Sequence, residues 1–255
     1  MEARRMVLLA AALLALVTHS EGIVNGGEAT PHSRPYMASI QEPKDGGFVH
    51  LCGGFLVADQ WVMTAAHCFT SGNAGMIVIL GAHSKTADES TKQRFEIQNL
   101  YSHPDFNPVN YDNDITLIKL DRAVQQTEAV KMVKYLRAGG SNPGTNDAVS
   151  TAGWGALGNL GEYPDKLMEV DIKIIARSTC FKNDRYGDDF TENMMCAAGS
   201  SKDSCKGDSG GPLLFQGVVV GITSNGGRKC GGLKKPGLYT IISRYTGWID
   251  SSMAQ

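Results

Sequence analysis

Residues 207–223 read GDSGGPLLFQGVVVGIT, a stretch that joins a glycine-rich turn to an apolar run. The run at 213–223 is rich in Val, Leu and Ile, and the residues that bound it are typical of β structure. In the turn, Ser209 lies between glycines. Such a bend can expose the serine hydroxyl while neighbouring backbone N–H groups converge on one point. Taken alone, the turn is equally compatible with an ordinary glycine-rich loop.

Other short apolar runs follow the same pattern along the chain. A helical period appears only near the end, at 242–253. Segments rich in Gly and Asn predict surface loops, and one near the middle is expected to connect two β halves. The additional runs are 54–63, 76–80, 115–120 and 168–175, and the loops are 137–147 and 155–161. We therefore predict one all-β domain with a terminal helix, because β-barrels commonly use more than about 200 residues as one unit.

The first twenty residues predict a secretory signal peptide. Arg4 and Arg5 precede an apolar run at 6–17, which is too short for a bilayer span of about 20 residues. No later segment resembles a membrane span. We therefore expect a secreted, extracellular protein with no membrane partner.

The composition is that of a folded globular protein. The chain is 42% hydrophobic and 20% charged, with a formal net charge of −2. That charge survives removal of residues 1–22, which carry two acidic and two basic side chains. A near-neutral balance does not steer a protein toward a polyanion, so no nucleic-acid partner is expected.

Six cysteines in a chain routed to an oxidising compartment favour disulfides. Counting alone leaves 15 pairings open. A structural zinc site would need close Cys-x-x-Cys or His-x-x-x-His pairs, which the sequence lacks. We expect neither a metal nor a cofactor. The cysteines are Cys52, Cys68, Cys180, Cys196, Cys205 and Cys230.

Two further motifs complement the serine. A serine nucleophile needs a base that titrates near neutrality, and His67 in Thr64-Ala-Ala-His-Cys68 supplies one. Asp114 directly precedes an apolar run, where a carboxylate needs a donor partner such as a histidine N–H. Asp112 is interpreted as a solvated loop residue. His32, His50, His83 and His103 are interpreted as surface or satisfied core histidines.

With these three motifs in the order His, Asp, Ser, the chain from Ile23 onward resembles the chymotrypsin-type serine proteases. The resemblance implies two packed six-stranded antiparallel β-barrels with a C-terminal helix. It implies a catalytic triad of His67, Asp114 and Ser209, and an oxyanion hole formed by the N–H groups of Gly207 and Ser209. It also implies the disulfides Cys52–Cys68, Cys180–Cys196 and Cys205–Cys230. A further family bridge is missing, since Val149 and Phe215 occupy its two positions.

The same resemblance implies activation by processing. Residues 23–27, IVNGG, resemble the new N-terminus of such proteases, whose free amino group would pair with Asp208. Glu21 and Gly22 precede Ile23 in place of a basic residue, so a tryptic activator is not expected. Signal peptidase cleavage after Ser20 would leave a dipeptide for an aminodipeptidase, and cleavage after Gly22 would release the active end directly. The expected organisation is a signal peptide at 1–20, a possible activation dipeptide at 21–22 and a protease domain at 23–255.

The resemblance further implies cleavage after Arg or Lys. Asp203, six residues before Ser209, would lie at the floor of the primary pocket, with Ser224, Gly226 and Gly237 around it. Arg228 would lie on the pocket rim as a candidate for self-inhibition.

This combination resembles the factor D branch of the family, which activates complement factor B in the alternative pathway. The leading hypothesis is therefore a monomeric protease whose partner is factor B bound to its activated partner. Asn225 and the missing disulfide depart from that branch. The alternatives are a granzyme-like immune granule protease of tryptic specificity and a non-catalytic binding homologue.

Overall fold

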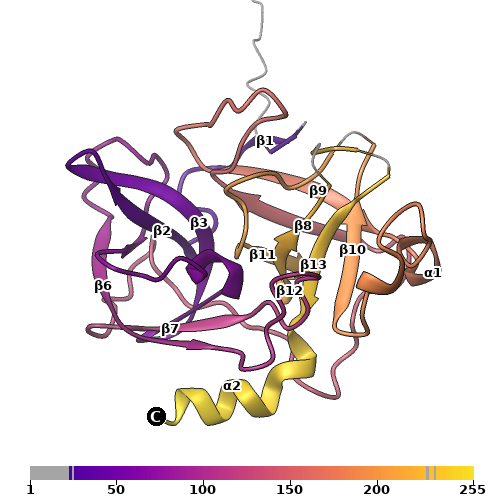
Figure 1. Ribbon diagram of the computed structural model, residues 1–255. Helices are drawn as coiled ribbons and strands as arrows, with labels where there is room; N and C mark the ends of the chain where they lie inside the picture. The colour runs from indigo at the N-terminus through magenta and orange to yellow at the C-terminus, as the bar shows by residue number, and fades with distance from the viewer. Residues whose placement is uncertain (1–22, 25, 201, 228–229, 233) are drawn as a thin grey trace, which may run out of the picture.

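The computed structural model describes residues 23–24, 26–200, 202–227, 230–232 and 234–255. The predicted signal peptide, the dipeptide Glu21-Gly22 and the rim candidate Arg228 lie outside the described residues. Two closed antiparallel β-barrels lie side by side, with the C-terminal helix beneath them (Figure 1). The predicted fold class is therefore confirmed.

The first barrel contains six strands in the order β2-β3-β4-β7-β6-β5, and β5 pairs again with β2 to close it. The predicted run at 54–63 contains a hairpin, because β3 ends at Ala58 and β4 begins at Trp61. The strands are β2 (Met37–Lys44), β3 (Gly47–Ala58), β4 (Trp61–Thr64), β5 (Ile77–Leu80), β6 (Gln93–Ser102) and β7 (Thr116–Leu120).

The second barrel is closed by the pairing of β8 with both β9 and β11. The predicted run at 213–223 is also a hairpin. Gln216 and Gly217 both have positive φ, 50° and 79°, which suits a two-residue turn between strands. The strands are β8 (Ala148–Gly153), β9 (Met168–Ile174), β10 (Met194–Ala198), β11 (Pro212–Phe215), β12 (Val218–Asn225) and β13 (Gly237–Ile241), and the short β1 (Gly27–Glu28) pairs with β9.

Few helices accompany the strands. The predicted terminal helix is present as a 3-10 turn, η3 (Ile242–Tyr245), followed by α2 (Thr246–Met253), which buries Ile249. The others are η1 (Ala66–Phe69), α1 (Arg177–Cys180) and η2 (Gly187–Asp189). No helix among the described residues has the length and apolar character needed to cross a membrane.

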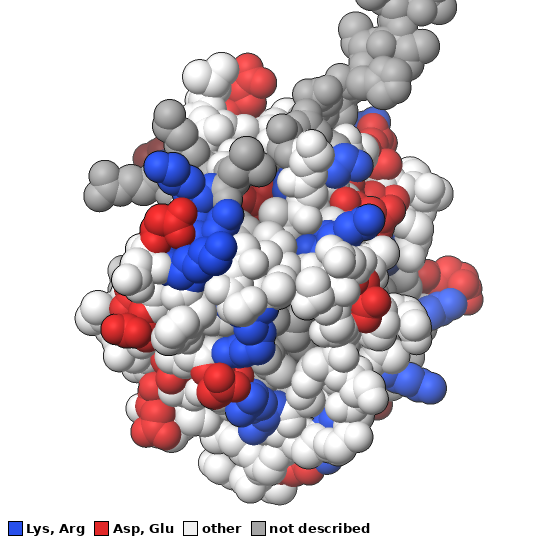
Figure 2. All heavy atoms as spheres, turned by 90° about the vertical axis from the view of Figure 1, so that its right-hand side faces the viewer, with Lys and Arg blue, Asp and Glu red and all other residues white. Residues whose placement is uncertain are grey.

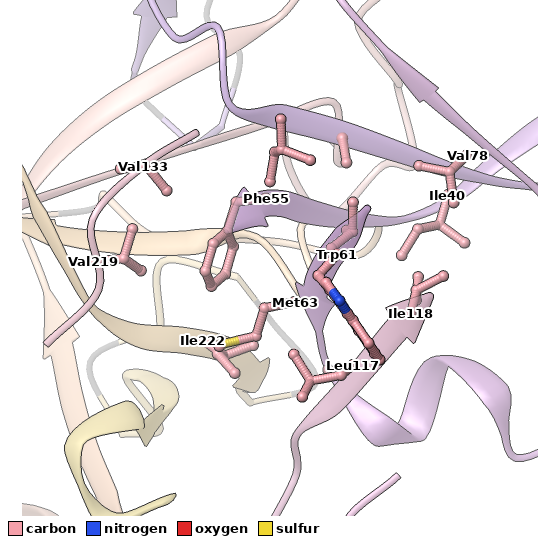
Figure 3. Close-up of a cluster of buried hydrophobic side chains, with 14 of the residues drawn as sticks. Ile40, Phe55, Trp61, Met63, Val78, Leu117, Ile118, Val133, Val219 and Ile222 are labelled. Atoms are coloured by element: carbon pink, nitrogen blue, oxygen red, sulfur yellow. The ribbon is translucent and has the colours of Figure 1, made fainter. Parts of the chain in front are cut away.

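A continuous apolar core joins the two barrels. Phe55 and Met63 of the first barrel belong to the same buried cluster as Val219 and Ile222 of β12, and the four side chains lie close together in Figure 3. Burying a side chain of this size contributes about 1.5–3 kcal/mol. The shared core therefore fixes how the barrels dock, and with it any site built from both.

The three disulfides have the expected pairing: Cys52–Cys68, Cys180–Cys196 and Cys205–Cys230. At the position of the missing bridge, Val149 on β8 is buried, and Phe215 on the adjacent strand β11 packs against the same apolar cluster. Apolar packing thus occupies the place of the cross-link without a change of fold.

Surface charge is mixed in sign. On the face that carries α1 and β10, basic and acidic side chains alternate, and neither sign covers the surface (Figure 2). This face agrees with the near-neutral total charge of the chain.

Candidate active site

A cavity of about 330 Å³ lies where the two barrels meet. The first barrel contributes His67 and Tyr111 to its wall, and the second contributes Asp203, Ser209 and Ser224. Residues that are far apart in the sequence are therefore brought to one cleft by barrel docking.

The Asp114 carboxylate holds His67 at two points. Asp114 Oδ2 lies 2.7 Å from His67 Nδ1, and Asp114 Oδ1 accepts the His67 backbone N–H at 2.9 Å. Because an ionised carboxylate only accepts, Nδ1 carries the hydrogen and Nε2 keeps a free lone pair. This is the tautomer that a general base requires.

The second barrel also binds Asp114, which is fully buried. Ser224 Oγ donates to Asp114 Oδ2 at 2.6 Å, and Thr240 Oγ1 donates to the Asp114 carbonyl oxygen at 3.0 Å. A buried carboxylate needs such donors to offset its lost hydration. Contacts from both barrels thus position Asp114.

His67 is positioned by a short tethered turn. Strand β4 ends at Thr64, and η1 begins at Ala66, so the chain turns sharply before the histidine. The disulfide from Cys68 to Cys52 ties this turn to β3. Cys52, His67 and Cys68 also form the one cluster of potential metal ligands among the described residues. However, both sulfurs are used in the disulfide and do not offer thiolate ligands.

Ser209 lies on a turn in which two positions require glycine. Gly207 and Gly210 have φ values of +96° and +80°, which side chains rarely adopt. A Cβ on Gly210 would lie 2.1 Å from Thr64 Oγ1. The Ser209 carbonyl accepts the Gly53 N–H at 2.8 Å, which links the turn to β3.

Ser209 and His67 line the same cavity, without a direct hydrogen bond between their side chains among the described contacts. Such contacts commonly tighten only when substrate binds.

The N–H groups of Gly207 and Ser209 donate no hydrogen bond within the described part of the chain. The Lys206 carbonyl accepts the Ala156 N–H at 2.7 Å. The carbonyl and N–H of a trans peptide point in opposite directions, so this bond directs the Gly207 N–H away from Ala156. Free donors next to a nucleophile can stabilise a developing oxyanion.

His50 supports the same turn, a role that the sequence interpretation missed. His50 Nδ1 lies 2.8 Å from Ser39 Oγ, and Nε2 lies 2.9 Å from the Gly207 carbonyl oxygen. Burial lowers the pKa of His50 to about 4. The ring is thus neutral at pH 7, and Nε2–H donates to the carbonyl while Nδ1 accepts from the serine. Its position in β3 gives no sequence signal for this contact.

Asp203 lies at the buried end of the cavity and is only 2% exposed. Its Oδ2 accepts the Gly231 N–H at 3.1 Å, while Oδ1 has no partner among the described residues. Burial raises the pKa of Asp203 to about 7. A Cβ on Gly237 would lie 2.7 Å from Oδ1, whereas a Cβ on Gly226 would enter open space. Oδ1 is therefore a buried carboxylate oxygen without a hydrogen-bond partner among the described residues.

Asp208 is fully buried and directly precedes Ser209. It accepts the N–H groups of Gly155 and Cys205 at 2.9 and 2.8 Å. Burial raises the pKa of Asp208 to about 6, although these hydrogen bonds oppose the shift. A Cβ on Gly153 would lie 2.2 Å from Asp208 Oδ1, so the carboxylate uses the space that this glycine leaves. Ile23 is also buried, in the apolar cluster of the second barrel.

The interpretation of Asp112 as a solvated residue was wrong. Its Oδ1 accepts Thr191 Oγ1 at 2.6 Å and Asn193 Nδ2 at 3.0 Å, both from the second barrel. The neighbouring Tyr111 was not singled out in the sequence, yet its ring centroid lies 5.4 Å from that of His67. Neither contact could be read from the sequence, because the partners of Asp112 are about 80 residues away in the chain and a ring contact leaves no local pattern.

Comparison with known proteins agrees with this geometry. The family model described as Trypsin matches residues 23–249. Mast cell protease 3 of Ovis aries is 41% identical, over 98% of this chain and 96% of that protein. Granzyme-like protein 1 of Rattus norvegicus is 39% identical, over 97% of this chain and 98% of that protein. Granzyme M of the same species is 36% identical, over 89% and 87%.

Proposed function

This chain belongs to the trypsin family of serine proteases, and we propose that it is an endopeptidase that cleaves after Arg or Lys. One observation carries the specificity. Asp203 is a buried carboxylate at the end of the cavity that holds His67 and Ser209, and one of its oxygens lacks a partner among the described residues. A substrate ammonium or guanidinium would supply that partner through a charge-assisted hydrogen bond.

The proposed chemistry follows from the geometry around His67. Ser209 Oγ attacks the carbonyl carbon of the peptide bond while its proton passes to His67 Nε2. Asp114 stabilises the resulting imidazolium through Nδ1–H, which it already contacts at 2.7 Å. The oxyanion accepts hydrogen bonds from the N–H groups of Gly207 and Ser209. His67 then gives the proton to the leaving amine, and water releases the acyl group by the same steps.

We further propose that the enzyme is secreted or stored in granules and becomes active when Ile23 is the first residue. The free α-amino group would then neutralise Asp208. An uncompensated buried charge is unfavourable by about 3–5 kcal/mol. Without the amine, this carboxylate destabilises the turn that carries Ser209 and the oxyanion donors.

Specificity is tested with the chain processed to begin at Ile23. Hydrolysis of matched peptides with Arg, Lys, Leu or Phe before the cut bond is compared between wild type and Asp203→Ala. Wild type should prefer Arg and Lys, and the variant should lose that preference. Equal discrimination by both proteins would remove Asp203 from the assignment, whereas cleavage after Leu or Phe alone would overturn the proposed specificity.

The alternative of a non-catalytic binding homologue is tested separately. A fluorophosphonate reagent should label the processed wild type at Ser209, and the Ser209→Ala variant should remain unlabelled. An unlabelled wild type would support the binding alternative, because the reagent reports a nucleophilic serine directly.

For the natural setting, we favour a granule-type immune protease over the factor D branch. The relatives described above have the names of a mast cell protease and of granzymes or granzyme-like proteins. The dipeptide Glu21-Gly22 before Ile23 supports the same choice. The self-inhibition expected of the factor D branch would involve Arg228, which is outside the described residues.

Kinetics separates these two settings. A granule-type enzyme should cleave small arginyl esters and basic peptides rapidly. Feeble ester cleavage, combined with efficient cleavage of complement factor B bound to its activated partner, would instead support the factor D branch.

A further inference from the structure

The loop between β6 and β7 is tied to the second barrel through one side chain. Asp112 Oδ1 accepts hydrogen bonds from Thr191 Oγ1 at 2.6 Å and Asn193 Nδ2 at 3.0 Å. Asn193 Nδ2 also lies 3.3 Å from Asn113 Oδ1 on the same loop. We call Asp112, Thr191 and Asn193 the cross-barrel clamp.

The second-barrel side of the clamp is itself held firmly. The Asn193 carbonyl accepts the Ile241 N–H at 2.8 Å, and the Thr191 carbonyl accepts Arg177 Nη2 at 2.9 Å. The Thr191 hydroxyl also accepts the Asn193 N–H at 3.2 Å. A fixed donor pair of this kind can hold a loop in one conformation.

On the loop side, one residue has a backbone conformation that its side chain disfavours. Tyr111 and Asn113, the two neighbours of Asp112, have φ values of 63° and 57°. For a tyrosine this left-handed conformation is uncommon and unfavourable, whereas asparagine adopts it readily. Such backbone persists only where surrounding contacts determine it. Within the loop the Tyr111 N–H donates to the Asn107 carbonyl at 2.8 Å, and the clamp holds the adjacent Asp112 from the second barrel.

The strained tyrosine faces the proposed general base. The Tyr111 ring lies edge to face with His67, with centroids 5.4 Å apart and an interplanar angle of 75°. Tyr111 also lines the cavity that holds Ser209. A displacement of this ring would change both the packing against His67 and the shape of the cavity wall.

We propose that Asp112 is a positioning residue that acts through Tyr111. By this account the cross-barrel clamp holds the tyrosine against His67 and so sets the orientation of the base and the space available to the substrate beside it. The inference rests on the proposed protease function and adds a role for a carboxylate outside the triad.

A purely structural role for Asp112 makes a different prediction. If the clamp only fastened the barrels together, its loss would lower stability, and the effect on activity would not depend on Tyr111. If it acts through Tyr111, the activity effects of the two residues must be coupled. Contacting residues that act as a unit show such non-additive effects in double-mutant cycles.

The test uses the processed chain with Arg peptides that carry either Gly or Phe before the Arg. Removal of the clamp in Asp112→Ala should lower kcat/KM for the Gly peptide by about tenfold to 10²-fold, the range expected for a slightly misplaced catalytic group. The ratio of kcat/KM for the Gly peptide to kcat/KM for the Phe peptide should also become smaller, because the Tyr111 ring is then no longer held in the cavity wall. Asp112→Asn keeps an acceptor and should restore most of the rate. Asp105→Ala, an exposed aspartate of the same loop, is the matched control.

Two further variants decide between the accounts. Thr191→Val, which removes one donor while keeping the side-chain shape, should reproduce part of the Asp112→Ala effect. In a Tyr111→Ala background, Asp112→Ala should have no additional effect on kcat/KM or on the ratio of kcat/KM between the Gly and Phe peptides. The proposal would be overturned if Asp112→Ala lowered kcat/KM as much in that background as in wild type. It would also be overturned if a folded Asp112→Ala protein kept the wild-type ratio of kcat/KM between the two peptides.

Thermal unfolding of each variant separates loss of fold from loss of positioning. If Asp112→Ala does not fold, Thr191→Val carries the same comparison, with Asp112→Asn as the variant that keeps the acceptor. An inactive wild type would refute the proposed function itself, whereas an active wild type with an unaffected clamp variant refutes only this inference.

Discussion

Replacing Asp203 by asparagine should make the protein more stable while removing its preference for basic substrates. Asp203 is only 2% exposed, and its Oδ1 lacks a partner among the described residues. Asparagine has nearly the same shape and carries no charge. The variant therefore tests whether the proposed specificity pocket lowers the stability of the fold.

The magnitude follows from the pKa of Asp203. Burial raises this pKa from 3.8 to about 7, a difference of roughly 3 pH units. One unit corresponds to about 1.4 kcal/mol, so ionised Asp203 disfavours folding by about 4 kcal/mol. The folded chain binds the proton more tightly than the unfolded chain, so wild-type stability should fall as the pH rises from about 4 to about 7. The Asp203→Asn variant lacks this dependence, and its advantage should be largest above about pH 7.

The measurement is urea unfolding in a Ser209→Ala background, which prevents self-cleavage. The free energies of unfolding with and without the Asp203→Asn substitution should agree near pH 4 and differ by a few kcal/mol near pH 8. Asp171→Asn, at an exposed position of β9, should show no such gap. If the protein that keeps Asp203 is as stable as the variant near pH 8, the argument from burial is refuted.

Three further outcomes are expected. Ser224→Ala removes one hydrogen bond to Asp114 and should lower kcat by about tenfold, measured with an arginyl peptide. Gly237→Ala would put a Cβ 2.7 Å from Asp203 Oδ1 and should strongly raise KM for that peptide. Gly226→Ala, whose Cβ meets open space, should change KM for the arginyl peptide little. A chain that retains residues before Ile23 should cleave the peptide far more slowly than the processed chain, with activity appearing as the new N-terminus is detected.

The fold could be predicted largely from motifs and short apolar runs. Runs at 76–80, 115–120 and 168–175 match strands to within a residue or two. The runs at 54–63 and 213–223 gave no separate signal for their internal turns, because Asp59-Gln60 and Gln216-Gly217 are too short to interrupt an apolar pattern. Barrel closure itself depends on pairings between distant strands, which no local period encodes.

The candidate site divides in the same way. Ser209 and His67 could be selected from the sequence, because each lies in a distinctive local motif: a glycine-rich turn and a histidine next to a cysteine. Asp112 and His50 could not, because their roles depend on Thr191, Asn193 and the Gly207 carbonyl, which only the fold brings near. An aspartate in a polar loop has the same sequence signal whether it is solvated or hydrogen-bonded across an interface.

The cross-barrel contacts explain why the cleft is also the place where buried charge gathers. Ser224 binds Asp114, Gly53 binds Ser209, and Thr191 binds Asp112, each across the junction of the two barrels. A cleft between two closed barrels is the part of such a fold where side chains can be buried yet face open space. Among the carboxylates of the cleft, Asp203 has an oxygen without a partner among the described residues, and the basic side chain of the proposed substrate would supply that partner. The docking that places His67 beside Asp114 and Ser209 therefore also sets the position of the catalytic residues relative to Asp203, which lines the same cavity.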